Sequence, residues 1–122
     1  MTDPRWVWGF KYILLRQDTH AKLPQKIGAM VPDGWTAYAR NGHLFVKQFR
    51  FDNKAAYADF GSNVEVFTNK RMLELETLGP LVQLQPSAAV EYVERWSLFR
   101  DVPTPTGDED VDRYVHPKIR PR

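Results

Sequence analysis

Short stretches in which apolar and polar residues alternate, separated by turn residues, follow one another along most of the chain. This alternation predicts strands, because residues two apart in a strand share a face. No window keeps an apolar period of 3.6 residues long enough to predict a helix. The pattern therefore predicts an all-β fold, an antiparallel β-sandwich. Strands are expected over residues 9–16, 25–31, 35–40, 43–51, 63–68, 71–78, 81–85 and 89–99.

Turn residues between these stretches predict how the strands pair. Asn41-Gly42 is a strong two-residue hairpin signal and joins residues 35–40 to 43–51. Asn69-Lys70 joins residues 63–68 to 71–78, and Pro32-Asp33-Gly34 closes an earlier strand. The alternation also predicts which side chains enter the core, namely Phe45, Phe49, Leu73, Leu75, Val90 and Trp96.

Composition narrows the class of protein. With 122 residues, 43% of them hydrophobic, the chain suits one compact domain. The formal charge of +2 is too small to indicate nucleic-acid binding, and no apolar run approaches the roughly 18 residues of a membrane span. Because the chain has no cysteine, disulfides, thiolate metal sites and a cysteine nucleophile are excluded. We expect a cytoplasmic protein that binds neither nucleic acid nor membrane.

The last twenty residues differ in character from the rest. They contain several prolines, an acidic run at residues 108–110 and a basic end at residues 116–122. This composition is typical of solvated or partner-wrapping arms. We therefore expect a β-sandwich domain over residues 1–102 and a charged, Pro-rich tail over residues 103–122 that lies outside the core.

Three glutamates fall on two neighbouring predicted strands. Glu74 and Glu76 project from one side of their strand, and Glu65 lies on the strand before it. A face with two or three carboxylates suits catalysis or the binding of a polar ligand. It is equally typical of an antiparallel sheet that exposes one polar face to water.

Other catalytic and metal-binding patterns are missing from the sequence. The three histidines, His20, His43 and His116, have no metal-ligand spacing, and no serine lies in a nucleophile elbow. We therefore expect no metal site and no cofactor.

Several sequence strings together resemble a known family. They are QKIG at residues 25–28, YADFGS at 57–62, NVEVFT at 63–68, LELETLGPL at 73–81 and VEYVERWSLF at 90–99. In this order they resemble the C-terminal half of a bacterial family of unknown function (DUF4380) within the galactose mutarotase-like superfamily. The resemblance covers about residues 9–102. It implies half of a β-supersandwich and, as in many members of that superfamily, carbohydrate binding.

The resemblance also implies candidate site residues. In the aldose 1-epimerases of the superfamily a histidine is the general acid and a glutamate is the base. The segment Leu75-Glu76-Thr77-Leu78 is similar to the one that carries this glutamate, which nominates Glu76 as a catalytic base. The predicted strands themselves, apart from the resemblance, nominate charged residues and one aromatic for substrate binding, namely Glu65, Glu74, Lys47, Arg95 and Trp96.

Two functions remain open from the sequence. The chain is either a module that binds a carbohydrate or a protein partner without catalysis, or an aldose 1-epimerase-like enzyme that completes its site through oligomerisation. An enzyme needs an acid within reach of Glu76, and no histidine matches the acid's motif, so the module is favoured. Half of a supersandwich would also leave apolar sheet surface uncovered, which predicts a homo-oligomer, most simply a dimer.

Overall fold

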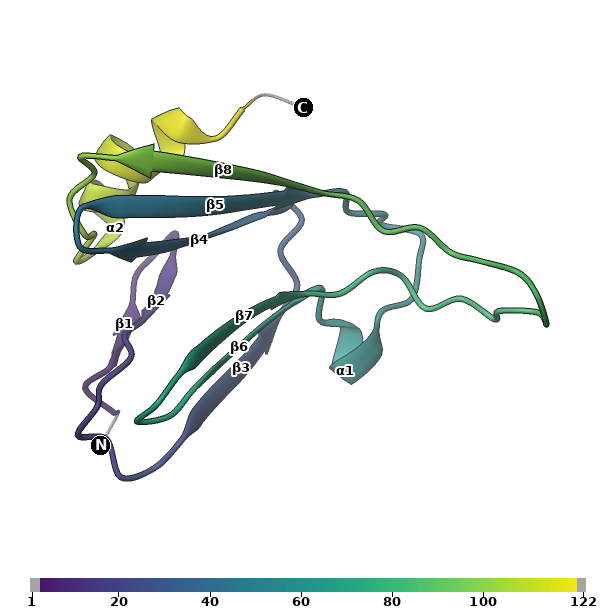
Figure 1. Cartoon of the computed structure of the whole chain (residues 1–122), viewed down its shortest axis with the longest axis horizontal. Coiled ribbons are helices and arrows are strands. Elements are labelled where there is room, and N and C mark those ends of the chain that lie inside the picture. The colour runs from purple at the N-terminus through teal and green to yellow at the C-terminus, as the bar shows by residue number, and fades with distance from the viewer. Residues whose placement is uncertain (1–2, 121–122) are drawn as a thin grey trace.

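The computed structural model describes residues 3–120, and its strands form three antiparallel sheets (Figure 1). This confirms the antiparallel, sandwich-like all-β fold. A two-stranded hairpin contains β1 (Trp6–Trp8) and β2 (Ile13–Leu15). One three-stranded sheet has the order β3 (Gln25–Ala29), β6 (Val64–Thr68), β7 (Leu73–Thr77), and the other has the order β4 (Trp35–Arg40), β5 (His43–Phe49), β8 (Glu94–Arg100). The helical turns are α1 (Ala58–Gly61), α2 (Asp108–Asp110), η1 (Val111–Val115) and η2 (His116–Lys118).

Both predicted hairpins form. Asn41 and Gly42 have φ angles of 51° and 75°, so the two-residue turn joins β4 to β5 with Arg40 opposite His43. Asn69 closes the β6–β7 hairpin, because its backbone N–H donates to the Met72 carbonyl over 3.0 Å. These turns are set by local residue types, so the sequence alone predicts them well.

The segment between β7 and β8 departs from the prediction. Residues 78–93 form no ladder and extend as an arm beyond both sheets (Figure 1), so the strand expected at 81–85 is wrong. Phe49 is buried as predicted, but Val90 and Trp96 are 57% and 66% exposed and do not belong to the core. Alternation separates the two faces of a strand, but it does not say which face another layer will cover.

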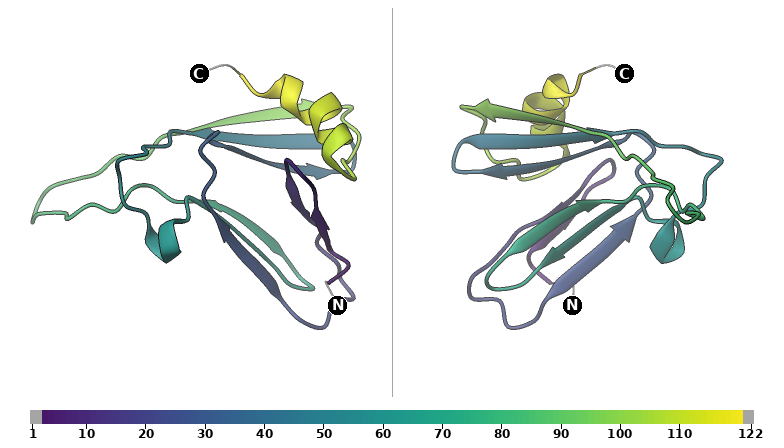
Figure 2. Two further views of the ribbon diagram at one scale, coloured as in Figure 1. Left: turned by 180° about the vertical axis from the view of Figure 1, so that it is seen from behind. Right: turned by 45° about the vertical axis from the view of Figure 1, so that its right-hand side comes forward.

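The tail is part of the core, which corrects the expectation that it lies outside. Val111 and Val115 are buried and pack with Leu44 and Val46 of β5 and with Val102. Figure 2 shows the helical segment lying along the β4–β5–β8 sheet. The pattern formed by Val111 and Val115, four residues apart, is too short to predict a helix from the sequence. In the structure, these two side chains nevertheless cover the apolar face of the sheet.

Polar contacts hold the tail at both of its ends. Near its start, the Asp108 carboxylate accepts hydrogen bonds from the backbone N–H groups of Phe10, Lys11 and Tyr12 at the tip of the β1–β2 hairpin. Near its end, the Gln48 amide donates to the Arg120 carbonyl over 2.9 Å and accepts from the Arg120 N–H. The tail therefore ties the hairpin to the β4–β5–β8 sheet.

Candidate functional site

The β3–β6–β7 sheet has one polar face. Its register places Gly28, Glu65 and Glu76 side by side across the three strands, and Lys26, Phe67 and Glu74 form the next row. The opposite face carries apolar and small residues such as Ile27, Val66 and Leu75. The structure thus brings the three nominated glutamates to one face and adds a lysine to them.

Glu65 is the buried member of this face. Glu65 is only 5% exposed, and its Oε2 atom forms an ion pair with the Lys26 Nζ atom at 2.7 Å. The hydrogen bond from Lys26 to Glu65 raises the pKa of the lysine, so Lys26 stays charged. The site therefore presents a buried carboxylate beside a half-exposed ammonium group.

A shallow cavity of about 460 Å³ lies over this pair, between β3 and the α1 turn. Gly28 forms part of its floor: a Cβ atom there would lie 2.4 Å from the Ser62 Oγ atom and 3.6 Å from the Glu65 Oε1 atom. The Ser62 hydroxyl itself donates to the Asp59 carbonyl over 2.9 Å. A side chain at Gly28 would displace Ser62 and close the space beside the carboxylate.

The α1 turn forms the rim of the cavity with an unusual backbone. Asp59, Phe60 and Gly61 have φ angles of 46°, 60° and 91°, so three successive residues are left-handed. Each non-glycine residue in this region costs roughly 1–2 kcal/mol. The turn holds the Phe60 ring fully exposed beside the cavity. Strain of this kind is retained at ligand sites more often than elsewhere.

Two of the nominated residues of the other sheet, Lys47 and Trp96, contact a different carboxylate, that of Glu94. Glu94 Oε1 pairs with Lys47 Nζ at 3.0 Å and accepts a hydrogen bond from Thr77, while its Oε2 accepts from the Trp96 indole N–H over 2.6 Å. Lys47 also donates to the Leu75 carbonyl. Burial alone would raise the pKa of Glu94, but these hydrogen bonds and the ion pair together hold it below its ordinary value.

This second cluster joins the two sheets. It links β5 and β8 to the end of β7, so Lys47 is a buried structural cation that lies apart from the glutamate face. Arg95 and Trp96 are both exposed on β8. The structure therefore does not bring Lys47, Arg95 and Trp96 together with Glu65, Glu74 and Glu76.

In the part of the chain that the structure describes, neither His20 nor His43 has its hydrogen-bond contacts at Glu76. Glu76 is exposed on the last strand of its sheet, opposite Glu65. The His20 ring contacts Thr19 in a loop, and the His43 ring contacts the Asn41 carbonyl at the β4–β5 turn. Within residues 3–120 no group of three or more histidine, aspartate or glutamate side chains could hold a metal ion.

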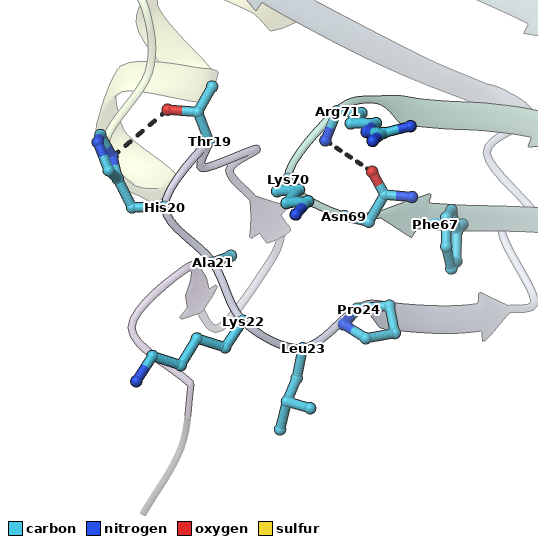
Figure 3. Close-up of a pocket in the computed structure, with 10 residues that line it drawn as sticks. All are labelled: Thr19, His20, Ala21, Lys22, Leu23, Pro24, Phe67, Asn69, Lys70 and Arg71. Carbon is cyan, nitrogen blue, oxygen red and sulfur yellow. Dashed lines mark hydrogen bonds between the residues drawn. The ribbon is translucent and has the colours of Figure 1, made fainter.

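A larger hollow of about 790 Å³ lies at the other end of the sheet, between residues 19–24 and the β6–β7 turn (Figure 3). Lys22, Lys70 and Arg71 surround it. Figure 3 shows Lys22 and Leu23 extending away from the turn, so the polar atoms do not converge on a common point. A binding site needs convergent polar groups, which the smaller cavity has and this one does not.

Of the residues that line the smaller cavity, only Glu65 was nominated from the sequence; those missed include Lys26, Asp59, Phe60 and Ser62. Lys26 was recoverable, because it lies two residues before Gly28 on the same face of β3. The other three belong to residues 57–62, which the hydrophobic pattern marks only as a loop. The left-handed conformation of Asp59 and Phe60 has no sequence signal apart from the Gly61 that follows them.

Comparisons with known protein families, with curated proteins and with solved structures find no match for this chain. In the part of the chain from residue 3 to residue 120, no helix is long and apolar enough to cross a bilayer. The geometry of the polar face is therefore what indicates a function for this chain.

Proposed function

We propose that this chain is a carbohydrate-binding module without catalysis, and that its ligand lies in the cavity between β3 and α1. One observation carries the proposal: a strained left-handed turn holds the exposed Phe60 at the rim of the cavity that the buried Glu65 also lines. An exposed aromatic ring next to fixed hydrogen-bonding groups is the combination that a sugar requires, because a sugar has both an apolar C–H face and hydroxyls.

The polar groups suit a neutral ligand. Lys26 and Glu65 cancel each other's charge, and between them they offer a donor and two acceptor oxygens. A sugar hydroxyl can donate to the Glu65 carboxylate, which lines the cavity, and a neighbouring hydroxyl can accept from Lys26. The cavity volume of about 460 Å³ falls within the usual range for small ligands and exceeds what one hexose needs.

The same geometry supports binding rather than epimerisation. Ring opening needs an acid and a base on opposite sides of the anomeric carbon. Glu65 and Glu76 approach from the same sheet face, and His20 and His43 have their contacts in turns away from it. The epimerase-like alternative would need an acid from another subunit, and no contact within residues 3–120 favours it.

Titration of the isotope-labelled chain with a panel of neutral mono- and disaccharides, followed by NMR, tests the proposal. Amide shifts should concentrate at residues 26–30 and 58–65. Phe60→Ala should weaken binding at least tenfold without loss of stability, because the ring is fully exposed and its backbone is strained.

Phe10→Ala is the matched control. Phe10 is also fully exposed, but it lies at the tip of the β1–β2 hairpin and should not affect binding. Saturating sugars that shift no amide near Glu65, or a Phe60→Ala variant that binds as well as the wild type, would refute the carbohydrate site.

A further inference from the structure

The chain exposes more surface than its mass requires. A compact monomer of 14.2 kDa exposes about 6,800 Å², whereas this chain exposes 9089 Å², an excess of roughly 2,300 Å². Each partner in a standard protein interface buries about 800 Å². The surplus is therefore large enough to supply one side of a stable interface.

Part of this surplus lies on β8, which is an edge strand. β8 pairs with β5 on one side, and within residues 3–120 no strand pairs with its other side. On one face of β8, Trp96 is 66% exposed and Leu98 is 78% exposed. On the other face, Phe99 packs toward the tail, with Lys118 Nζ 5.6 Å from its ring centre. An open edge with large apolar side chains is a site where another strand adds.

The sequence of β8, ERWSLFR, is complementary to itself when it is read in the opposite direction. If two copies pair antiparallel about Ser97, Glu94 lies opposite Arg100 and Trp96 lies opposite Leu98. Opposite charges and large apolar pairs across neighbouring strands each stabilise the pairing by roughly 0.2–1 kcal/mol, and Glu94 would accept from Arg100 of the second copy in addition to its bonds within its own chain. Because all four side chains share one face of β8, one register makes both kinds of pair at once.

Other registers lose this match. A twofold axis perpendicular to the joined sheet pairs residues that lie on the same face of β8. Each possible register is therefore centred on one residue, and neighbouring registers differ by one residue in the position of this centre. A centre at Trp96 places Glu94 opposite Leu98, and a centre at Leu98 places Trp96 opposite Arg100. On the Trp96 face, both separate Glu94 from Arg100 and put a charge against an apolar side chain, whereas the register centred on Ser97 has one such pair, Arg95 opposite Phe99, on the other face.

We propose that two copies of this chain pair through β8 about a twofold axis at Ser97. The pairing joins the two β4–β5–β8 sheets into one six-stranded sheet and removes the open edge. It is isologous, so the pair closes on itself and does not extend into a filament. This pairing is independent of the carbohydrate site, which lies on the other sheet.

A single cysteine tests the register directly, because the chain contains none of its own. Ser97→Cys places the two thiols opposite each other at the axis, within the roughly 4.4–6.8 Å Cα separation that a disulfide bridges. Under mild oxidation at micromolar concentration, it should form a linked dimer at least tenfold faster than the control Ser87→Cys. Ser87 lies on the exposed arm, where only random collision joins two chains.

Sedimentation equilibrium of the wild type and two lysine variants completes the test. The wild type should have twice the mass of one chain, and Leu98→Lys should shift it to 14.2 kDa without unfolding, because Leu98 is exposed. Leu84→Lys, on the exposed arm, should leave the dimer intact. A wild type of 14.2 kDa at all concentrations, a dimer unaffected by Leu98→Lys, or equal oxidation rates of the two cysteine variants would overturn the proposal.

Discussion

Asn63 holds Val31 through both ends of its side-chain amide. The Val31 N–H donates to Asn63 Oδ1 over 2.7 Å, and Asn63 Nδ2 donates to the Val31 carbonyl over 3.0 Å. Asn63 is fully buried, and its backbone also bonds to Ala29 and Leu78. One side chain therefore fixes where the chain leaves β3 relative to the start of β6, next to the cavity between β3 and α1.

Replacing Asn63 with Ala should lower the free energy of unfolding by about 3 kcal/mol, because two backbone groups of Val31 lose their partners in a buried place. Urea denaturation measures the change. Asn53→Ala, in an exposed loop, is the control and should alter stability by less than about 0.5 kcal/mol. A loss no larger than the control's would show that Val31 finds other partners.

The free energy of unfolding should decrease at acidic pH, in part because Glu94 becomes protonated. Its pKa lies below the ordinary value of 4.5 in the folded chain, so its contribution is present above that pH and is lost as the pH falls through the folded pKa. Glu94→Gln should reduce stability at pH 7 and flatten the decline below about pH 4.5. Thermal melts of both proteins from pH 7 to pH 2 compare the slopes, and parallel curves would contradict the assignment.

The Asp108 carboxylate should control how firmly the β1–β2 hairpin is attached. Asp108→Ala removes the acceptor for three backbone N–H groups, at a cost of about 1–2 kcal/mol. Amide hydrogen exchange should accelerate at Phe10, Lys11 and Tyr12, while the amides of β6 stay protected. Unchanged exchange at the three amides would mean that the tail does not hold the hairpin in solution.

Glu76 should be dispensable for binding and mildly unfavourable for folding. It faces Glu65 across the β6–β7 ladder, and like charges directly opposite destabilise a sheet. Glu76→Gln should therefore raise stability by about 0.5 kcal/mol and keep sugar affinity. In polarimetry neither protein should accelerate the mutarotation of any aldose. Acceleration by the wild type that Glu76→Gln abolishes would instead support the epimerase-like alternative.

Much of the candidate site was beyond the reach of sequence reasoning. The period-two pattern correctly places Glu74 and Glu76 on one face, because side chains alternate along any strand, and the register of β6 on β7 brings Glu65 to the same face. The pattern does not reveal that Glu65 is buried against Lys26, since that depends on which strand lies next to β6. Nor does it reveal that Phe60 stands at the rim, because the conformation of a loop is decided by the elements that hold its ends.

The sequence by itself determined the local features of the fold: strands with two distinct faces, and the hairpins at Asn41-Gly42 and Asn69-Lys70, whose turns depend on short-range sterics and hydrogen bonds. Only the tertiary structure decided that Val111 and Val115 of the tail enter the core while Trp96 stays outside it. Burial depends on which surfaces meet in space, and these surfaces come from segments far apart in the chain. The residues next to a side chain in the sequence therefore cannot specify whether that side chain is buried.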